Sequence, residues 1–323
     1  MAIVIYLPHT AEPLAGVLGA LGFCKTVVDK RRSCVFVGRQ NCHRADLRAR
    51  FETIGEIRGV AYLDDAVGKI YAVCENWSTI CVFHAVPPFE QLRGIHVGGL
   101  RDPSDIAACG TNQLLYVSDC AEGCVWQVTT GGKVDWRLPE RRASSVCPAF
   151  LSVGFGRLVV GEAHSISIYD PHDDKVDGMA FPESVTLHHA VESDRKTFLV
   201  ALSDAGQSAV REFKPDGGGE WTRLREWSSG PSRASVGRPL YMACDAAGSL
   251  YVAVFGSHRV LVLDQSLNVL QSVRLYKRSA PKRMCFLARR QKSLLIVGAS
   301  SSVDMYDGVC GSFPPKQRRY VWS

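Results

Sequence analysis

Donors that suit hard metal ions follow four apolar runs of this sequence at nearly the same place. They are Glu75 with Asn76, Asp119, Glu162 with His164, and Asp204. If the runs converge in space, such a ring of donors would hold the metal of a hydrolase or lyase. Other runs place Gly38 or Arg39, Gly256 and Ser300 there, so the ring is incomplete. Because Asp and Asn at a strand end also accept hydrogen bonds from the next turn, Asp119, Glu162 and Asp204 are weak metal candidates.

Other patterns with catalytic potential are absent or incomplete. The sequence has no G-x-S-x-G elbow and no P-loop, and "GVLGALG" (16–22) lacks the G-x-G-x-x-G spacing. "DPHDDKVDG" (170–178) has Lys175 where a calcium loop needs Gly, and a polar hairpin turn explains it. His188 and His189 are adjacent and point to opposite sides of a strand, so we expect one of them to pack or to line a channel. We predict no catalytic residue, no cofactor and no enzymatic activity.

The twelve cysteines are not spaced as zinc ligands are. The closest pairs are Cys120/Cys124, Cys74/Cys81 and Cys34/Cys42, and no C-x-x-C occurs. Most cysteines lie in or beside apolar runs, where a free thiol behaves as a small hydrophobe. We therefore expect buried, reduced cysteines and a cytoplasmic protein. The N-terminus lacks a basic n-region and no run is long enough to span a bilayer, so we expect neither secretion nor a membrane partner.

These residues would be positioned by a repeated pair of β-runs. "SLYVAVFGSHRVLVLD" (249–264) alternates apolar and polar residues, breaks at Gly256 and alternates again. Equivalent first runs recur at a spacing of mostly about forty-five residues. Most units add one run before this pair and a more polar run after it. Four short strands make one antiparallel blade, and blades must stack in a ring to bury both faces. The first runs lie at 34–38, 69–73, 114–118, 157–161, 197–201, 249–253 and 294–298. The sequence predicts an all-β propeller.

The number of blades and the closing strand depend on the N-terminal residues. Seven blades are favoured over six if residues 23–55 form a blade. We expect an N-terminal segment, residues 1–22, and a propeller over residues 23–323. The strand that completes the last blade would be "MAIVIYL" (1–7), within the N-terminal segment, or "RRYVWS" (318–323). The only trace of a helical period, a weak one, lies in "HRADLRARFETI" (43–54).

Several units resemble the NHL repeat. "RPLYMACDAAGSLYVAVFGSHRVLVLDQSLNVLQSV" carries the resemblance, and "VFVGRQNCHRADL" keeps an Asn-x-His-Arg element as Asn41, His43 and Arg44. "DPSDIAACGTNQLLYVSDCAEGCVWQV" matches nearly as well, with Asp119 closing the second strand. The resemblance covers most of the chain, although the units between 146 and 227 share only the strand rhythm. It implies a propeller fold, more often of six blades, and no particular function.

The net charge of +6 gathers in connectors that a propeller would bring to one rim, where only Glu56, Asp102 and Glu140 offset it. Arginine forks suit phosphates and carboxylates and stack on bases or aromatic rings. Such a rim resembles the RNA-binding surface of NHL propellers in tripartite-motif proteins. The chain lacks the zinc sites and heptads of their RING, B-box and coiled-coil parts, so ubiquitin-ligase activity is not implied. The rim candidates are Arg58, Arg101, Arg141, Arg142, Arg233, Arg238, Lys277, Arg278, Lys282, Arg283, Trp77 and His258.

The sequence therefore predicts a non-enzymatic scaffold. Its rim would present loops to a protein or peptide partner. The alternative is single-stranded RNA binding through the arginine-rich rim, and the third possibility is a metal-dependent hydrolase or lyase. Nothing in the sequence identifies the partner or the oligomeric state.

Overall fold

The structure is a computed structural model, and it falls into two compact units, Met1–His43 and Arg44–Ser323. The residues that it describes are 3–6, 25–29, 34–38, 42–44, 46–53, 55–64, 68–86, 90–138, 147–170, 176–193, 195–216, 220–228, 239–245, 248–254, 259–275, 281–289, 292–299 and 301–307. In the first unit Ile3–Tyr6 (β1), Lys25–Asp29 (β2) and Cys34–Gly38 (β3) form an antiparallel sheet in the order β1-β3-β2. The unit boundary at residue 43 differs from the expected boundary at residue 22.

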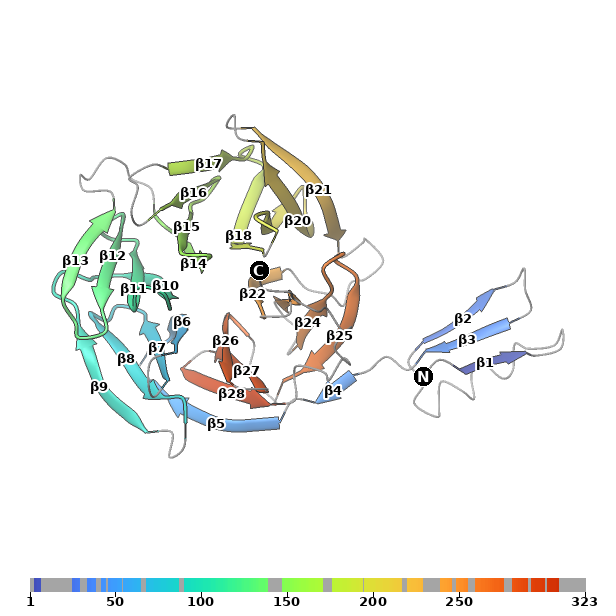
Figure 1. Cartoon of the computed structure of the whole chain (residues 1–323), viewed down its shortest axis with the longest axis horizontal. Coiled ribbons are helices and arrows are strands. Elements are labelled where there is room, and N and C mark those ends of the chain that lie inside the picture. Colours follow the sequence, from blue (N-terminus) through green and yellow to red (C-terminus); the bar gives the residue numbers. More distant parts are fainter. Residues whose placement is uncertain are drawn as a thin grey trace, which may run out of the picture. The chain divides into compact units, whose positions relative to one another are not determined.

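The second unit is an all-β propeller, as predicted, and its blades follow one another around the ring (Figure 1). Each blade contains four antiparallel strands in chain order, from the inside outward. Blade 1 is Ile57–Leu63 (β6), Lys69–Cys74 (β7), Thr79–His84 (β8) and Gln91–His96 (β9). Blade 2 is Pro103–Cys109 (β10), Leu114–Asp119 (β11), Cys124–Thr129 (β12) and Val134–Leu138 (β13). Blade 3 is Phe150–Gly154 (β14), Arg157–Gly161 (β15), Ser165–Tyr169 (β16) and Val176–Ala180 (β17).

The other three blades complete the ring. Blade 4 is Val185–Glu192 (β18), Phe198–Asp204 (β19), Gln207–Pro215 (β20) and Trp221–Ser228 (β21). Blade 5 is Pro239–Cys244 (β22), Leu250–Val254 (β23), Arg259–Leu263 (β24) and Val269–Arg274 (β25), and its sheet order continues to Cys42–Arg44 (β4). Blade 6 is Arg283–Arg289 (β26), Lys292–Ala299 (β27), Ser302–Asp307 (β28) and Asp46–Glu52 (β5).

Six blades close the ring in the described part of the chain. The inner strands β6, β10, β14, β18, β22 and β26 neighbour one another in this order, and β26 also lies beside β6. The described residues therefore show six blades, the alternative count, and not the favoured seven. Residues 25–38 do form strands, but these strands pair with β1 and not with a fourth strand of a blade.

The closing strand is β5, which the sequence analysis did not identify. β5 pairs with β28 in register from Ser302↔Glu52 to Asp307↔Asp46. Arg50 donates from Nε and Nη2 to the two carboxylate oxygens of buried Asp304, both at 2.7 Å. Ile3–Tyr6 is not the closing strand because it pairs with β3, and residues 318–323 lie outside the described residues. The weak helical period at 43–54 is also wrong, since β4 and β5 occupy it.

The core lies in the seams between blades. Six clusters of buried hydrophobic residues are present among the described residues, and each joins two adjacent blades. β-branched and aromatic residues suit these pleated, two-sided interfaces. In the seam between blades 6 and 1, Phe51 of β5 packs on Phe83 of β8 with ring centroids 4.6 Å apart. The outer strand of the last blade therefore contributes directly to the core.

The meander gives the ring two different faces. One carries the connectors between blades and the turns between second and third strands, and we call it the connector face. The other carries the turns between first and second and between third and fourth strands, and we call it the turn face. Within the described residues there is no helical segment of the length and apolarity needed to cross a membrane.

Candidate functional site

A buried polar cluster fills the centre of the ring toward the connector face, and we call it the plug. It consists of Asp105 (β10), His189 (β18), Tyr241 (β22) and Arg283 (β26). The Asp105 carboxylate accepts hydrogen bonds from the N–H groups of Ile106 and Leu151, both at 2.9 Å. Arg283 Nε lies 3.4 Å from Asp105 Oδ1, and its guanidinium is stacked 5.1 Å from the centroid of the Tyr241 ring.

His189 ties the plug to two further strands. Its Nδ1 accepts a 3.3 Å hydrogen bond from the Met242 N–H, and its Nε2 lies 3.3 Å from the Leu151 carbonyl oxygen. Its ring stacks on Tyr241 at 3.6 Å between centroids. The expectation that one of the two adjacent histidines packs or lines the channel is thus confirmed for His189. His188, the other one, meets the Ser203 hydroxyl at 2.8 Å.

Burial shifts the two titrating groups of the plug in opposite directions, because it disfavours whichever form is charged. Burial raises the pKa of Asp105 to about 6, although Arg283 and the two N–H groups oppose the shift. Burial lowers the pKa of His189 to about 3, and the positive charge of Arg283 adds to this effect. His189 is therefore a neutral imidazole at physiological pH. The arrangement holds five inner strands together, and its fully buried groups are poorly placed to receive a substrate.

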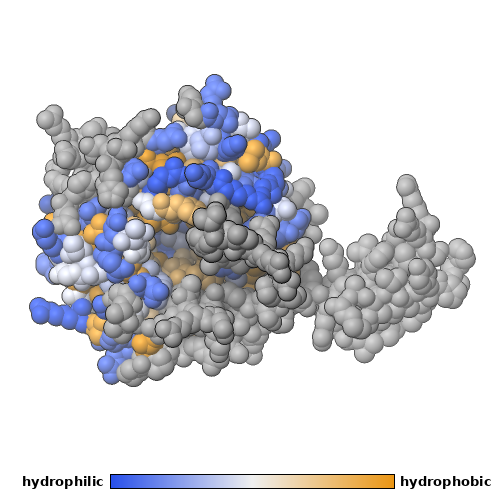
Figure 2. Space-filling view, viewed as in Figure 1, coloured by the Kyte–Doolittle hydropathy of each residue, from blue (hydrophilic) through white to orange (hydrophobic). Residues whose placement is uncertain are grey.

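Close backbone approach lets the inner strands meet at the plug. Gly59 of β6 faces β10, where a Cβ on it would lie 2.5 Å from the Ile106 nitrogen and 2.8 Å from Asp105 Oδ1. Above the plug, toward the turn face, the channel widens into a cavity of about 220 Å³. Apolar residues of all six inner strands line most of it, together with Ser152, His189, Glu192 and Cys244. Figure 2 shows one face hollowed at its centre, with hydrophobic residues in the walls of the hollow.

A second cavity, of about 300 Å³, lies between blades 4 and 5, and we call it the interblade pocket. Its floor is formed by the buried side chains of Leu199, Leu250 and Leu267. Glu192 and Cys244 line both this pocket and the channel cavity. Phe155, in the turn between β14 and β15 of blade 3, forms part of its wall. The other residues that line it are Ser193, Arg195, Glu212, Asp245, Gly248, Asp264 and Gln265.

Exposed hydrophobic side chains gather on the same blades. Among the described residues four large ones are exposed: Phe155 on blade 3, Leu224 on blade 4, and Val269 with Leu270 on blade 5. Phe155 is 68% exposed and has a φ of 50°, a backbone conformation that costs energy for a bulky residue. This site was not predicted from the sequence. The signal was "GFG" (154–156), a Phe between two glycines in a tight turn.

The predicted rim residues that the structure describes lie on the connector face, and their cations are paired. Arg58 pairs with Glu75, and Lys282 pairs with Glu56, whose pKa it lowers by hydrogen bonding. Arg101 Nε lies 3.2 Å from Glu122 Oε1, and Arg283 belongs to the plug. Trp77 is half-buried and packs on the seam between blades 6 and 1. The remaining candidates lie outside the described residues: Arg141, Arg142, Arg233, Arg238, Lys277, Arg278 and His258.

The three weak metal candidates each have a protein partner. Buried Asp119 accepts hydrogen bonds from the N–H groups of Arg101, Asp102, Ala121 and Glu122 at 2.9–3.3 Å, and from Trp126 Nε1 at 3.3 Å. Glu162 accepts one from the Ser165 hydroxyl at 2.7 Å, and Asp204 lies 3.5 Å from Arg211. Within the described residues no three acidic, His or Cys side chains are grouped to hold a metal ion. Asp119 thus fastens the connector ahead of β10 to the turn between β11 and β12.

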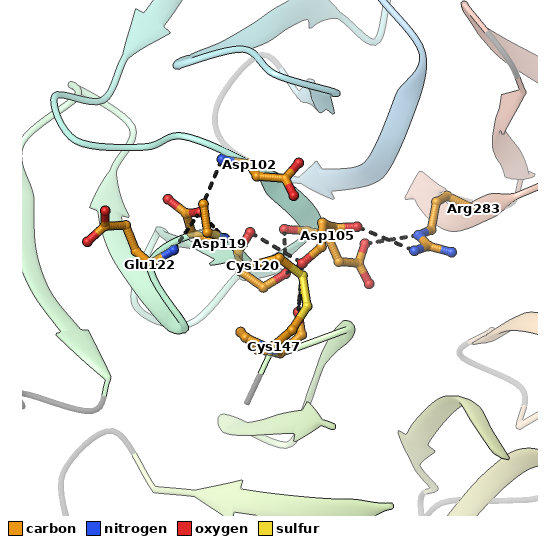
Figure 3. Close-up of a disulfide and its surroundings, with 11 residues drawn as sticks. Asp102, Asp105, Asp119, Cys120, Glu122, Cys147 and Arg283 are labelled. Atoms are coloured by element: carbon orange, nitrogen blue, oxygen red, sulfur yellow. Dashed lines mark hydrogen bonds and ion pairs between the residues drawn. A yellow bond between two sulfur atoms is a disulfide. The ribbon is translucent and has the colours of Figure 1, made fainter. Parts of the chain in front are cut away.

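One cysteine pair sits at disulfide distance near the plug. Cys120, after β11, is bonded to Cys147 before β14 (Figure 3). The Pro148 carbonyl accepts a 2.6 Å hydrogen bond from the Ser104 hydroxyl, and Ser104 in turn is hydrogen-bonded through its carbonyl to Arg283. The disulfide therefore joins blades 2 and 3 beside the plug. Free, buried cysteines were expected, and Cys74, Cys81, Cys109 and Cys124 are of this kind. The Cys120–Cys147 pair was not predicted from the sequence.

Comparisons with known proteins show the fold and leave the function open. No protein-family model matches the chain and no curated protein matches it. A gluconolactonase from Xanthomonas campestris is similar with a TM-score of 0.64 at 11% identity, covering 83% of this chain and 96% of that one. Virginiamycin B lyase from Staphylococcus aureus gives 0.58 at 9%, covering 82% and 99%, and the WD40 propeller domain of Doa1 gives 0.56 at 13%, covering 82% and 97%.

Proposed function

We propose that this propeller is a non-enzymatic scaffold that binds a protein or peptide segment. The binding surface is the turn face of blades 3, 4 and 5, with the interblade pocket at its centre. This keeps the function expected from the sequence but moves it from the connector face to the opposite side of the ring.

One observation carries the proposal: the exposed hydrophobic residues and the interblade pocket share the same three blades. Phe155 lines the pocket, and Leu224, Val269 and Leu270 lie on the outer strands of the two blades that form it. An exposed aromatic ring in the wall of an apolar hollow is typical of an interaction site, whereas scattered exposed hydrophobic residues are ordinary. Phe155 is the strongest member because a strained backbone holds its ring at the wall of the pocket. The positive φ itself belongs to this turn, since Gln113 and Lys196 adopt it in the corresponding turns of blades 2 and 4, and Phe155 differs from them by placing an exposed aromatic ring there.

The comparisons and the resemblance support a propeller and do not choose among its uses. WD40 domains, NHL repeats, a lactonase and a lyase share this architecture, and function lies in the site. On the described part of the connector face, Arg58, Arg101 and Lys282 each form an ion pair with a glutamate carboxylate. An RNA would have to displace these carboxylates, which favours the turn face over the arginine rim as the binding surface.

The test is a selection of random dodecapeptides on the folded protein. Enriched peptides are then synthesised with a fluorophore, and their affinity is measured by anisotropy. Phe155→Asn is the diagnostic variant, because Asn tolerates positive φ and removes the ring. We expect it to weaken binding by about tenfold or more, as for a hot-spot aromatic. Gln113→Asn is the matched control, since Gln113 has a φ of 56° at the equivalent turn of blade 2.

Three outcomes would overturn the proposal. They are a selection without enrichment, equal binding by Phe155→Asn and wild type, and an equal loss in Gln113→Asn. A fluorescent single-stranded RNA is titrated in the same assay at two salt concentrations. Tight, salt-sensitive RNA binding that Arg233→Ala with Arg238→Ala abolishes would instead establish the RNA alternative. Arg283 is left unchanged in this arm because it belongs to the plug.

A further inference from the structure

The interblade pocket has an apolar floor and carboxylates in its walls. Leu199, Leu250 and Leu267 form the floor, and the four carboxylates are those of Glu192, Glu212, Asp245 and Asp264. Three guanidinium groups oppose them: Arg195 in the lining, Arg157 paired with Glu192, and Arg225 paired with Glu212. One negative charge is therefore in excess. Arg195 is directed to the Gln265 side chain, to which it donates a 2.9 Å hydrogen bond.

Groups of the protein itself already hold Glu212. Its Oε1 accepts a 2.7 Å hydrogen bond from the Thr197 hydroxyl, and its Oε2 lies 2.8 Å from Arg225 Nε in an ion pair. Because Oε2 is buried, Glu212 contributes negative charge to the wall and is not the contact for a ligand.

The Asp245 and Asp264 carboxylates are already fixed in place. Asp245 accepts from the Ser249 N–H at 2.9 Å and from the Tyr251 hydroxyl at 3.1 Å. Asp264 accepts from the Ser266 and Asn268 N–H groups, both at 2.8 Å. Partial burial acts to raise the pKa of Asp264, but the hydrogen bonds from Asn268 lower it overall. These carboxylates need no rearrangement to attract a cation.

We propose that the interblade pocket receives the arginine side chain of the partner segment. The aliphatic stem lies on the leucine floor, the guanidinium donates to the Asp245 and Asp264 carboxylates, and the Phe155 ring covers it. Arginine suits this pocket better than lysine because its planar fork bonds several acceptors at once and stacks on an aromatic ring. The inference rests on the proposed function, since it specifies which residue of the bound segment enters the pocket.

The experiment uses the peptides from the selection described above. Each arginine in an enriched peptide is replaced in turn by citrulline, which keeps the shape and removes the charge, and by lysine. We expect one arginine per peptide at which citrulline weakens binding about tenfold and lysine weakens it less. Asp245→Asn combined with Asp264→Asn keeps both turn acceptors and removes two negative charges. In this variant the difference between arginine and citrulline should largely disappear.

The matched control removes the same charge elsewhere on the turn face. Asp64 accepts from the Tyr62 hydroxyl beside the equivalent turn of blade 1, and Glu90 ends the turn between β8 and β9 of the same blade, outside the proposed binding surface. The variant Asp64→Asn with Glu90→Gln should keep the wild-type preference for arginine. Peptides that depend on Phe155 but tolerate citrulline everywhere would overturn this inference and leave the proposed function standing. Loss of arginine preference in the control variant would also overturn it, because the effect would then be long-range charge.

Discussion

At the scale of single residues, burial explains most of what the polar side chains do. Asp105 and His189 lie in one cluster, yet burial favours the neutral form of both, so their pKa values move in opposite directions. Asp119 is saturated by backbone N–H groups and serves the fold. At the interblade pocket, by contrast, Phe155 is exposed, and the Asp245 and Asp264 carboxylates lie in the wall.

Replacing His189 by Gln should make the protein less sensitive to acid. The folded protein holds the pKa of His189 at about 3. The unfolded chain, with an ordinary pKa of about 6.5, therefore binds more protons between these values. The free energy of unfolding then falls as the pH drops from about 6.5, by up to about 1.4 kcal/mol per pH unit. The raised pKa of Asp105 acts in the opposite sense below pH 6 in both proteins, so the comparison isolates His189.

Urea unfolding of wild type and His189→Gln at pH 7.0, 5.5 and 4.5 measures this difference. Gln retains both a donor and an acceptor for Leu151 and Met242. We expect the stability of the variant relative to wild type to increase steadily toward pH 4.5. Parallel pH profiles for the two proteins would contradict the neutral, buried imidazole.

At the scale of elements, the strands were predictable but two of their partners were not. The runs "IRGVAYL" and "PSDIAAC" are β6 and β10 to the residue. "CVFVG" is also a strand, but the repeated spacing of the strands does not predict that it pairs with Ile3–Tyr6. "DLRARFE" (46–52) alternates polar and apolar residues, which is the period of a strand, although the sequence analysis noted only a weak helical period. It pairs with β28, which lies at the other end of the propeller's sequence, and no local sequence pattern predicts that pairing.

Truncating Phe51 should loosen the closure of the ring. Its ring is buried between β5 and blade 1, and removing it leaves a cavity against Phe83. Phe51→Ala should lower the free energy of unfolding by about 3–5 kcal/mol in urea titrations. Leu224→Ala, which truncates an exposed side chain on blade 4, is the control and should cost less than about 0.5 kcal/mol. A similar small loss in both variants would mean that β5 does not seal the ring.

The Cys120–Cys147 disulfide should stabilise the contact between blades 2 and 3. The two cysteines are 27 residues apart, a loop for which the chain-entropy relation gives about 3–4 kcal/mol. Urea unfolding of air-oxidised protein should shift to lower denaturant when dithiothreitol is added. Cys120→Ser should remove this response, and Cys109→Ser, a buried free cysteine, should keep it. A wild-type protein that ignores reductant would show that the pair is not bonded.

At the scale of the whole molecule, the plug makes the blades interdependent. Five of the six inner strands contribute to these contacts, so a substitution at one strand should destabilise the others. The contributing residues are Asp105, Leu151, His189, Tyr241 and Arg283. The sequence predicted the propeller because each blade repeats the same pattern. It could not predict the plug or the interblade pocket, because each is assembled from residues of several blades. For the same reason it grouped Arg283 with the rim.

Replacing Asp105 by Ala tests this interdependence. It leaves the Arg283 charge buried without its carboxylate and two N–H groups without an acceptor. Breaking a buried pair in this way costs about 3–5 kcal/mol. Circular dichroism and tryptophan fluorescence should still follow one coincident transition, at lower denaturant. Asp177→Ala on the outer strand of blade 3 should leave the midpoint nearly unchanged, and two separate transitions in Asp105→Ala would contradict the idea that the blades unfold together.

The pairing of β5 with β28 has a consequence for biosynthesis. Arg50 and Asp304 are separated by 254 residues, so a ribosome needs roughly ten to fifty seconds between making one and making the other. During that interval β5 has left the ribosome without the strand that it pairs with. Its unpaired edge can therefore pair with other nascent chains translated from the same mRNA. The misassembly that this architecture invites is an exchange in which β5 of one copy completes blade 6 of another.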